Sequence, residues 1–345
     1  MKRKAGFGVP VGEGSRRREA GKEMAMAGER KHSRSGKPQS GTRAFVSEAR
    51  RTPGFSFFDL LHGYVYARWP YLYIGVGKGD HPLTRVFKWL VAPFSFAGGL
   101  FGKRIPEAKR HGIGSGTVAD TYHGKVVPLE QAKQLIEVNE EITLHDLEHV
   151  LPYPKARDII LRNPDHLVAL ECPCRSSKPD GCRPLDVCLV VGEPFAGMVM
   201  QHHASRARWI DRGEAVEILQ AEHERGHVHH AFFKDAMLGR YYAICNCCSC
   251  CCGAMQLTRD GVPMLASSGY VSRVDASLCT ACGDCEQSCP FGALGLVEET
   301  VCVDGEACMG CGVCVSVCQK QALALVRDPE KSEPLVIQEL IRQAQ

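Results

Sequence analysis

The chain has 345 residues, 44% of them hydrophobic, which is enough for two or more modest domains with their own cores. Its 19 cysteines are far above ordinary usage. Their odd number, their crowding into tight runs and the lack of an apolar stretch in the first fifty residues argue against an extracellular disulfide scaffold. We therefore expect reduced thiolates that bind metal in a cytoplasmic setting.

The net charge of +3 conceals a basic N-terminal segment. Residues 1–55 carry fourteen Lys and Arg against five Glu, a net charge of +9, so the remainder of the chain sums to −6. No nucleic-acid-binding fold accompanies this segment, so its composition predicts a disordered basic tail over residues 1–54 and no nucleic-acid partner.

Residues 55–117 form an aromatic-rich segment that begins FSFFDLLHGYVYARWPYLYIGVG. Asp59, His62 and Arg68 interrupt its apolar run, whereas a membrane-spanning helix needs about 18 or more apolar residues in succession. Tyr and Trp beside Arg and His would suit contact with a membrane surface. Packing on the protein's own core or on a partner is the more common use of such residues, so membrane contact is the weaker alternative.

A mixed α/β pattern follows over residues 118–268. Pro128 in a first turn predicts a helix through the next eight residues, and HLVALE at 166–171 predicts a strand that leads directly into CPCR. Asp211 has the character of a capping box and predicts a helix that Gly226 ends.

Ten cysteines of this mixed domain are candidate metal ligands. They lie in ECPCRSSKPDGCRPLDVC and in ICNCCSCCCG, and the second stretch has six cysteines in eight positions. The ten are Cys172, Cys174, Cys182, Cys188, Cys245, Cys247, Cys248, Cys250, Cys251 and Cys252. Unmetallated thiols in such number would invite oxidation and mispairing, so the pattern predicts metal binding by a pooled set of ligands.

The six cysteines of the second stretch are too many for a single four-coordinate site. If residues 245–252 are extended, successive side chains point to opposite faces. The alternation then places Cys245, Cys247 and Cys251 on one face and Cys248, Cys250 and Cys252 on the other. This division of the six cysteines into two sets of three favours two metal sites, each completed by thiolates from the 172–188 loops. One cluster with bystander cysteines, or a structural zinc ion, is the alternative.

The stretch His223-Glu-Arg-Gly-His227 also satisfies the HExxH pattern of zinc metalloproteases. That pattern needs both histidines on one helical face, whereas Gly226 is better placed to end the helix. Phe233 stands where a metzincin has its third His. We therefore do not expect a protease, and the sequence also lacks a nucleotide-binding glycine loop and a flavin motif.

The strongest signal is an eight-cysteine repeat with a period of 29 residues. Cys279-x2-Cys282-x2-Cys285-x3-Cys289 is followed by Cys308-x2-Cys311-x2-Cys314-x3-Cys318. A cubane cluster needs four converging thiolates, three from a tight loop and the fourth from the start of a helix in the other repeat. On that logic Cys279, Cys282, Cys285 and Cys318 bind one cluster, and Cys308, Cys311, Cys314 and Cys289 bind the other.

This spacing resembles that of the bacterial two-[4Fe–4S] ferredoxins over about residues 270–327. Gln319 replaces the proline that follows the first repeat, a departure that removes no ligand. Cys302 aligns with Arg273 in a strand position, so we expect it to be a small buried residue. Upstream, the combination of CPCR and NCCxCCC over about residues 120–268 is similar to that of a group of iron–sulfur proteins from anaerobic and respiring microbes, and it implies no particular reaction.

The chain is thus predicted to be an α+β protein. A ferredoxin-like two-cluster module at 269–327 follows the mixed α/β cysteine-rich domain, and an amphipathic C-terminal helix within 328–345 docks on the body.

The expected function is iron–sulfur electron transfer, as a single protein or as a subunit of a redox complex. Two [4Fe–4S] clusters are expected in the module and one or two further iron–sulfur clusters upstream, with redox proteins as partners. Seven acidic and three basic residues between 270 and 327 would suit a basic partner. The alternatives are an oxidoreductase with an unusual iron–sulfur active site in 118–268, or a carrier or scaffold for metal.

Overall fold

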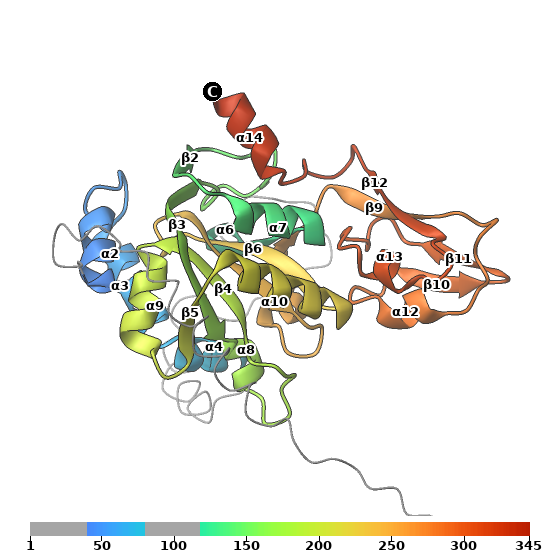
Figure 1. Cartoon of the computed structure of the whole chain (residues 1–345), viewed down its shortest axis with the longest axis horizontal. Helices are drawn as coiled ribbons and strands as arrows, with labels where there is room; N and C mark the ends of the chain where they lie inside the picture. The colour runs from blue at the N-terminus through green and yellow to red at the C-terminus, as the bar shows by residue number, and fades with distance from the viewer. Residues whose placement is uncertain (1–39, 80–117) are drawn as a thin grey trace, which may run out of the picture. The chain divides into compact units, whose positions relative to one another are not determined.

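A computed structural model describes residues 40–79 and 118–345. The described chain mixes helices and sheets, which agrees with the predicted α+β class (Figure 1). The helices are α2 (Gly41–Ala49), α3 (Phe57–Arg68), α4 (Pro70–Lys78), α6 (Val118–Thr121), α7 (Leu129–Glu137), α8 (Pro173–Ser176), α9 (Phe195–His203), α10 (Arg212–Glu224), α11 (Gly253–Arg259), α12 (Asp284–Ser288), α13 (Val313–Val317) and α14 (Ile337–Ala344).

The strands form one large sheet and two small ones. They are β1 (Tyr122–Val126), β2 (Ile142–Leu144), β3 (Ile159–Glu171), β4 (Asp186–Glu193), β5 (Ala207–Ile210), β6 (Val228–Lys234), β7 (Arg240–Cys247), β8 (Leu265–Ala266), β9 (Tyr270–Val274), β10 (Leu294–Val297), β11 (Thr300–Val303) and β12 (Leu323–Arg327). The large sheet has the order β2-β3-β4-β7-β6-β1-β8, with β5 also paired to β3, and its pairs are antiparallel except for β1 with β8.

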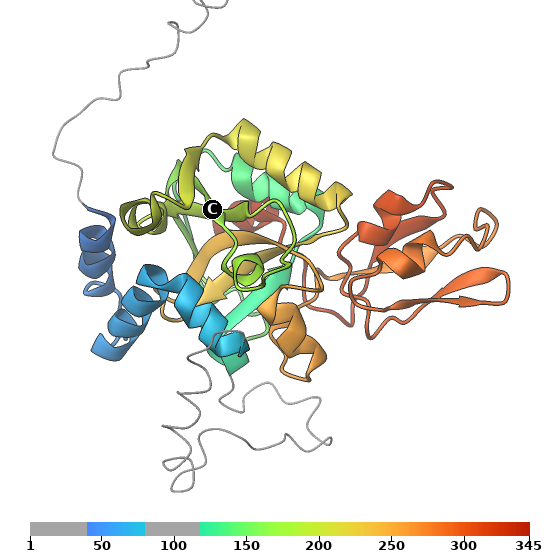
Figure 2. The same cartoon turned by 90° about the horizontal axis from the view of Figure 1, so that it is seen from below.

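The large sheet is covered by helices on both faces (Figure 2). Helices α7, α10 and α14 pack with one face into a core that includes Leu135, Leu219 and Ile337. Helices α2, α3, α9 and α11 pack with the other face into a second core. Because both faces are covered, β6 is buried along its whole length, as expected for a central strand. We call residues 40–79, 118–268 and 328–345 the sheet domain.

The prediction of a disordered tail over residues 1–54 is wrong for its last part. Gly41–Ala49 form helix α2, whose start is capped by Ser40 and whose Phe45 is completely buried against α9. Glu48 on this helix pairs with the buried Arg240, at 2.8 Å. Composition missed the helix because these contacts are made with distant parts of the chain. Residues 1–39 lie outside the described part.

The aromatic-rich segment forms α3 and α4 as far as residue 79, and its remainder lies outside the described residues. Ser56 and Asp59 form a capping box at the start of α3, and Tyr66 is buried in the core. Phe57 and Phe58 are instead exposed. The expected packing on the protein's own core therefore holds for one side of α3. No helix among the described residues has the length and apolar character needed to cross a membrane.

The other elements expected in the mixed domain are present. Helix α7 begins after Pro128, and β3 contains the predicted strand and extends it toward the N-terminus. Asp211 caps α10 by accepting a hydrogen bond from the amide of Glu214. The helix ends at Glu224, and Gly226 follows with a φ of +76°, a left-handed conformation that glycine adopts without a steric penalty.

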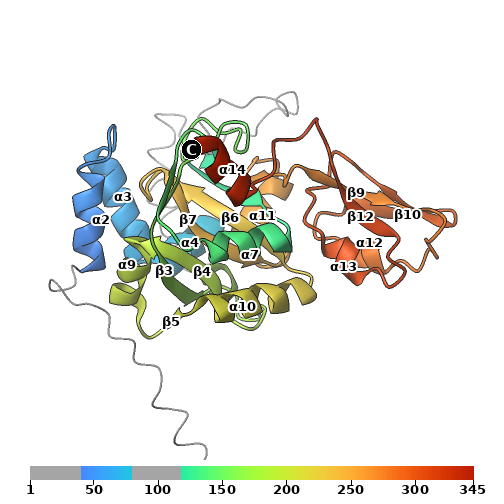
Figure 3. The same cartoon turned by 45° about the horizontal axis from the view of Figure 1, so that its top comes forward.

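Residues 269–327, which we call the ferredoxin module after the resemblance of their spacing, follow β8 and precede α14 in the chain. Figure 3 labels their β9, β10, β12, α12 and α13. Strand β9 pairs with β12, and β10 pairs with β11. The internal repeat of the sequence recurs in the structure, because α12 and α13 each follow a left-handed glycine, Gly283 and Gly312. After β12 the chain returns to the sheet domain, where α14 packs against α7 and β2 as the amphipathic pattern predicts.

Candidate metal centres

The eight cysteines of the ferredoxin module lie around two cavities. The first site is lined by Cys279, Cys282, Cys285 and Cys318. The second site is lined by Cys289, Cys308, Cys311 and Cys314. These are the two sets that the crossed ligation pattern pairs, each with three thiols from one repeat and one from the other. The residues present therefore fit a four-thiolate cluster at each site.

The two sites have different surroundings. Cys282 of the first site is exposed, and the amide of Ala281 is the main cause of a lowered pKa at Cys279. At the second site, burial raises the pKa of Cys311 to about 12 and that of Cys314 to about 11. Without metal, the thiols of Cys311 and Cys314 would thus stay protonated at neutral pH and release their protons only when a metal binds.

Backbone amides and one hydroxyl reach the sulfur atoms of the module. The amide of Ala293 donates to Cys289 Sγ at 3.2 Å, and the amide of Ala322 donates to Cys318 Sγ at 3.3 Å. At the second site the amide of Ser272 lies 3.4 Å from Cys308 Sγ, and Ser272 Oγ lies 3.3 Å from Cys314 Sγ. Hydrogen bonds of this kind set the reduction potential of an iron–sulfur cluster.

Cys302 is exposed rather than buried, which corrects the expectation from its alignment with Arg273. Among the described residues strand β11 pairs only with β10, and alternation along it turns Val301 inward and Cys302 outward. The residue lines neither cavity of the module.

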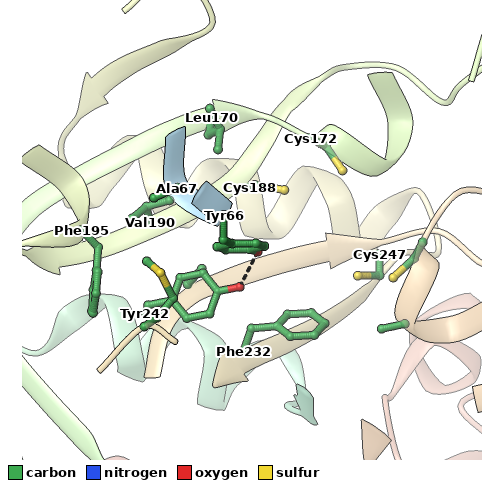
Figure 4. Packing of buried hydrophobic residues seen from close by; sticks show 14 of the residues in the cluster. Tyr66, Ala67, Leu170, Cys172, Cys188, Val190, Phe195, Phe232, Tyr242 and Cys247 are labelled. Carbon is green, nitrogen blue, oxygen red and sulfur yellow. Dashed lines mark hydrogen bonds between the residues drawn. The ribbon is translucent and has the colours of Figure 1, made fainter. Parts of the chain in front are cut away.

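Six of the ten upstream cysteines gather on one face of the large sheet. This six-thiol group is defined by thiols that interact with one another and consists of Cys172, Cys174, Cys188, Cys245, Cys247 and Cys252. Cys188 on β4 lies directly across from Cys245 on β7. The others come from the end of β7, from the turn into α8 and from the start of α11. Figure 4 shows Cys172, Cys188 and Cys247 in the same interior region as the Tyr66 ring.

The thiols of this group shift one another's pKa. The thiol of Cys174 raises the pKa of Cys172, and Cys188 raises it further. A hydrogen bond with Cys252 lowers the pKa of Cys247 to about 6, and the nearby His230 lowers it further. The six thiols interact one after another, in the order Cys245, Cys188, Cys172, Cys174, Cys252 and Cys247. They are therefore close enough to share one centre.

A cavity of about 90 Å³ adjoins the six-thiol group and is lined by all six of its cysteines. Tyr66, Tyr122 and Tyr242 line its other side, and the hydroxyls of Tyr66 and Tyr242 are 2.8 Å apart. Buried Lys234 lies over the Tyr66 and Tyr122 rings, with its Nζ 4.8 Å and 4.6 Å from their centroids. Sequence reasoning missed these residues because nothing in their spacing relates them to the cysteines.

His230 is completely buried beside the six-thiol group, directly across the sheet from Cys245. Neither of its ring nitrogens makes a hydrogen bond of regular geometry within the described part of the chain, although the Cys247 thiol is close enough to interact with the ring. A buried imidazole without partners is costly, so the arrangement fits a site that is completed by a bound group.

The other four upstream cysteines form a separate four-thiol group: Cys182, Cys248, Cys250 and Cys251. The three-plus-three division is therefore present, but Cys251 and Cys252 are exchanged relative to the predicted alternation. Strand β7 ends at Cys247, and the chain turns before α11 starts at residue 253, so an alternation that assumes an extended backbone does not reach Cys251.

Arg175, which follows the CPC sequence, supports the region between the two thiol groups. Its side chain is buried, forms an ion pair with the buried Glu222 and donates to the carbonyl of Asn246 at 2.9 Å. His227 Nδ1 is 2.7 Å from Glu222 Oε2. His227 lies beyond the end of α10 and pairs with Glu222, so the HExxH residues do not form the helical zinc site of a protease.

Comparison with known proteins identifies only the C-terminal part. Residues 272–319 match the family model of the 4Fe-4S dicluster domain. No curated protein and no solved structure matches the chain. The repeated spacing and the two four-thiol cavities agree with this match, so the stretch from 272 to 319 is similar to a 4Fe-4S dicluster domain and supports an iron–sulfur module there.

Proposed function

We propose that the protein relays electrons from a redox partner, through the two sites of the ferredoxin module, to a third iron–sulfur centre held by the six-thiol group. When bound, [4Fe–4S] clusters supply one-electron carriers with tunable potentials. We assign Cys279, Cys282, Cys285 and Cys318 as ligands of the first site and Cys289, Cys308, Cys311 and Cys314 as ligands of the second.

The observation that carries this proposal is the position of the second site. Its Cys311, with Phe291 and Met309, packs against the core that contains Cys247 and Cys252 of the six-thiol group. The amide of Ser268 donates to the carbonyl of Met309 at 3.0 Å, which joins the module to the sheet domain beside that site. The second site thus packs on the core to which four thiols of the six-thiol group belong, whereas Cys282 of the first site is exposed, and this order supports a relay that enters at the first site.

The third centre is assigned from the residues of the six-thiol group. Four of its six thiols would suffice for a cubane cluster, and the unpartnered His230 provides either a further ligand or a hydrogen-bond donor to sulfur. The remaining cysteines and the three tyrosines close the site from water, because all of them line the same interior cavity.

Anaerobic reconstitution with iron and sulfide analysis tests the cofactor content. We expect about eight iron atoms per chain from the module and about twelve when the six-thiol group also holds a cubane cluster. The variant Cys172→Ser/Cys188→Ser/Cys247→Ser should lose about four iron atoms and four sulfides. Cys302→Ser is the matched control, because that exposed thiol lines none of these sites. Fewer than about eight iron atoms in the parent would refute the assignment of the module.

The relay itself can be tested with a reductant too bulky to enter the protein, such as reduced viologen coupled to dextran. Freeze-quenched EPR samples of the parent should show all three centres reduced in sequence. The variant Cys311→Ala removes a ligand of the second site, so the first site should still be reduced while the third centre is reduced at least about tenfold more slowly. Reduction of the third centre at the parental rate would contradict the relay.

A second candidate function, an oxidoreductase, is favoured by the cavity of about 90 Å³ beside the six-thiol group. An active-site cluster would need an iron position open to that cavity. Cyanide added to the reduced parent should then change the EPR signal of the third centre and leave both module signals unchanged. An unchanged third signal would favour the relay over the enzyme.

A further inference from the structure

The four-thiol group differs in geometry from every other set of cysteines in the described residues. The Sγ atoms of Cys182, Cys248, Cys250 and Cys251 all lie within 4.8 Å of one another. Cys182 Sγ is 3.2 Å from Cys250 Sγ, which is 3.6 Å from Cys251 Sγ. These thiols are not joined by disulfides.

Such short separations fit a single ion. With metal–sulfur bonds of about 2.3 Å, the corners of a regular tetrahedron are about 3.8 Å apart. The thiolates of a cubane cluster bind four different irons and must therefore stand farther apart. The module provides an internal reference, because none of its cysteines forms a group with all sulfur atoms within 4.8 Å, although they match a 4Fe-4S domain.

The surroundings of the group are suited to a negatively charged site. Four thiolates around a divalent ion carry a net charge of −2. Lys178 Nζ donates to the carbonyl of Cys250 at 2.7 Å, and Arg259 donates to the carbonyl of Ser249 at 2.8 Å. Both cations approach the same short turn, where their charges offset that of the thiolates.

The burial of the four residues indicates a site that metal can reach and then stabilise. Cys250 is exposed, whereas Cys248 and Cys251 are buried and also line the cavity of the six-thiol group. Cys182 comes from the loop between α8 and β4. A metal bound here would tie that loop to the turn that carries Cys248 and Cys251, and so hold one wall of the cavity.

We propose that Cys182, Cys248, Cys250 and Cys251 bind one tetrahedral metal ion, Zn²⁺ or iron, without sulfide. The four thiols bind as thiolates and release their protons to solvent. The ion holds the loop of Cys182 against the turn before α11. This site goes beyond the proposed electron relay and does not depend on it.

Metal and sulfide analysis of the full chain tests the stoichiometry. The variant Cys182→Ser/Cys250→Ser replaces the two least buried ligands and should lose one metal ion per chain, with no loss of sulfide and unchanged EPR signals from the module. Cys302→Ser should lose nothing. Loss of about four iron atoms with four sulfides would show a cluster in place of a single ion, and an unchanged metal content would exclude the site.

X-ray absorption on the parent protein keeps the test independent of any variant that fails to fold. If zinc is present, its K-edge should show four sulfur neighbours at about 2.3 Å and no neighbouring metal. If the metal is iron, ⁵⁷Fe Mössbauer spectra should contain one mononuclear tetrathiolate component beside the clusters. A parent with neither signal refutes the proposal, and the relay would be unaffected because its iron and EPR signals are measured separately.

Discussion

The ferredoxin module and the sheet domain differ in the size of the hydrophobic core that supports their cysteines. The hydrophobic cluster of the module has five buried members, Cys285, Leu294, Val301, Cys314 and Leu323, and two of these five are themselves proposed ligands. The sheet domain instead buries a large apolar cluster on each face of its sheet, and four thiols of the six-thiol group are buried members of one of them.

This difference in core size indicates which region needs its metal in order to fold. A hydrophobic cluster of five buried residues is too small to stabilise a fold unaided, and in such small domains the free energy of metal binding is also the free energy of folding. The sheet domain buries enough apolar surface to fold first and to present its thiols afterwards. The next four predictions test this comparison, from the largest expected effect to the smallest.

Complete removal of metal should unfold the module and leave the sheet domain folded. After chelation under reducing conditions, amides in β9, β10, β11 and β12 should lose their protection from hydrogen exchange. Amides in β6 and β7 should keep theirs, because both strands are buried by helices on either side. Hydrogen exchange measured by mass spectrometry follows both regions in one sample. If the amides of the module stay protected, its fold does not depend on metal.

Within the sheet domain, the largest effect of a single substitution is expected from Arg175→Met. The change removes the fully buried cation beside Glu222 and leaves its carboxylate with the less buried Arg225 and His227. It also removes the side-chain donor to the carbonyls of Pro184 and Asn246, so the free energy of unfolding should fall by about 3–5 kcal/mol. Urea unfolding followed by circular dichroism measures it. The matched control is Arg208→Met, whose ion pairs are about half exposed and should contribute less than about 1 kcal/mol.

If the loss of stability is confined to the sheet domain, the EPR signals of the module should not change in Arg175→Met. Equal losses in the two Arg variants would show that the buried pair is not what stabilises the ligand-bearing strands.

Acid should weaken the sheet domain through the buried imidazole of His123. Burial lowers the pKa of this group to about 4, and its ring stacks on Tyr153 at 3.9 Å between centroids. Because the unfolded chain binds the proton near pH 6.5 and the folded chain does not, the free energy of unfolding falls as the pH drops below about 6.5. At pH 5 the loss is about 2 kcal/mol.

The variant His123→Phe should remove that part of the pH dependence. Urea unfolding at pH 7 and pH 5 compares it with the parent, and the parent should lose about 2 kcal/mol more over this interval. An equal loss of unfolding free energy in both proteins would show that groups other than His123 cause the acid sensitivity. The difference between the two proteins cancels the contribution of cluster loss at low pH, which both share.

The smallest effect is expected from Ser272→Ala, which removes the hydroxyl beside Cys314 Sγ. One neutral hydrogen bond is worth about 0.5–1.5 kcal/mol, or about 20–60 mV for a one-electron couple. The potential of the second site should fall by that amount, and that of the first site should stay constant. Redox titration followed by EPR measures both, with Ser316→Ala as the control because its hydroxyl contacts a carbonyl. A shift of the first site would contradict the assignment.

The sequence predicted the module in more detail than the sheet domain, for a physical reason. The ligands of the module are local, so fixed spacings such as Cys279-x2-Cys282 determine which thiols meet, and crossed pairing follows from the repeat. The six-thiol group forms only when β4 and β7 pair, and no spacing records that contact. Arg175 and Glu222 are 47 residues apart and meet only in the folded chain.

Two local errors have the same origin. The side on which Cys251 lies depends on where β7 ends, and the exposure of Cys302 arises because β11 belongs to a two-stranded sheet with β10 in the part of the chain that the structure describes. A pattern of alternating residues predicts two faces, but it does not tell which face another element covers. Helix α2 was missed because Phe45 and Glu48 gain their partners from the sheet domain.

The module is attached to the sheet domain at both of its ends, since the chain leaves after β8 and returns to dock α14. Lys331 strengthens the return by donating to the carbonyl of Cys308 at 2.7 Å. A domain held at two points keeps its neighbour at a fixed, very high effective concentration. In the proposed relay, transfer from the module to the six-thiol group should therefore be first order and insensitive to viscosity and salt, whereas delivery of electrons to the module by a separate protein should depend on both.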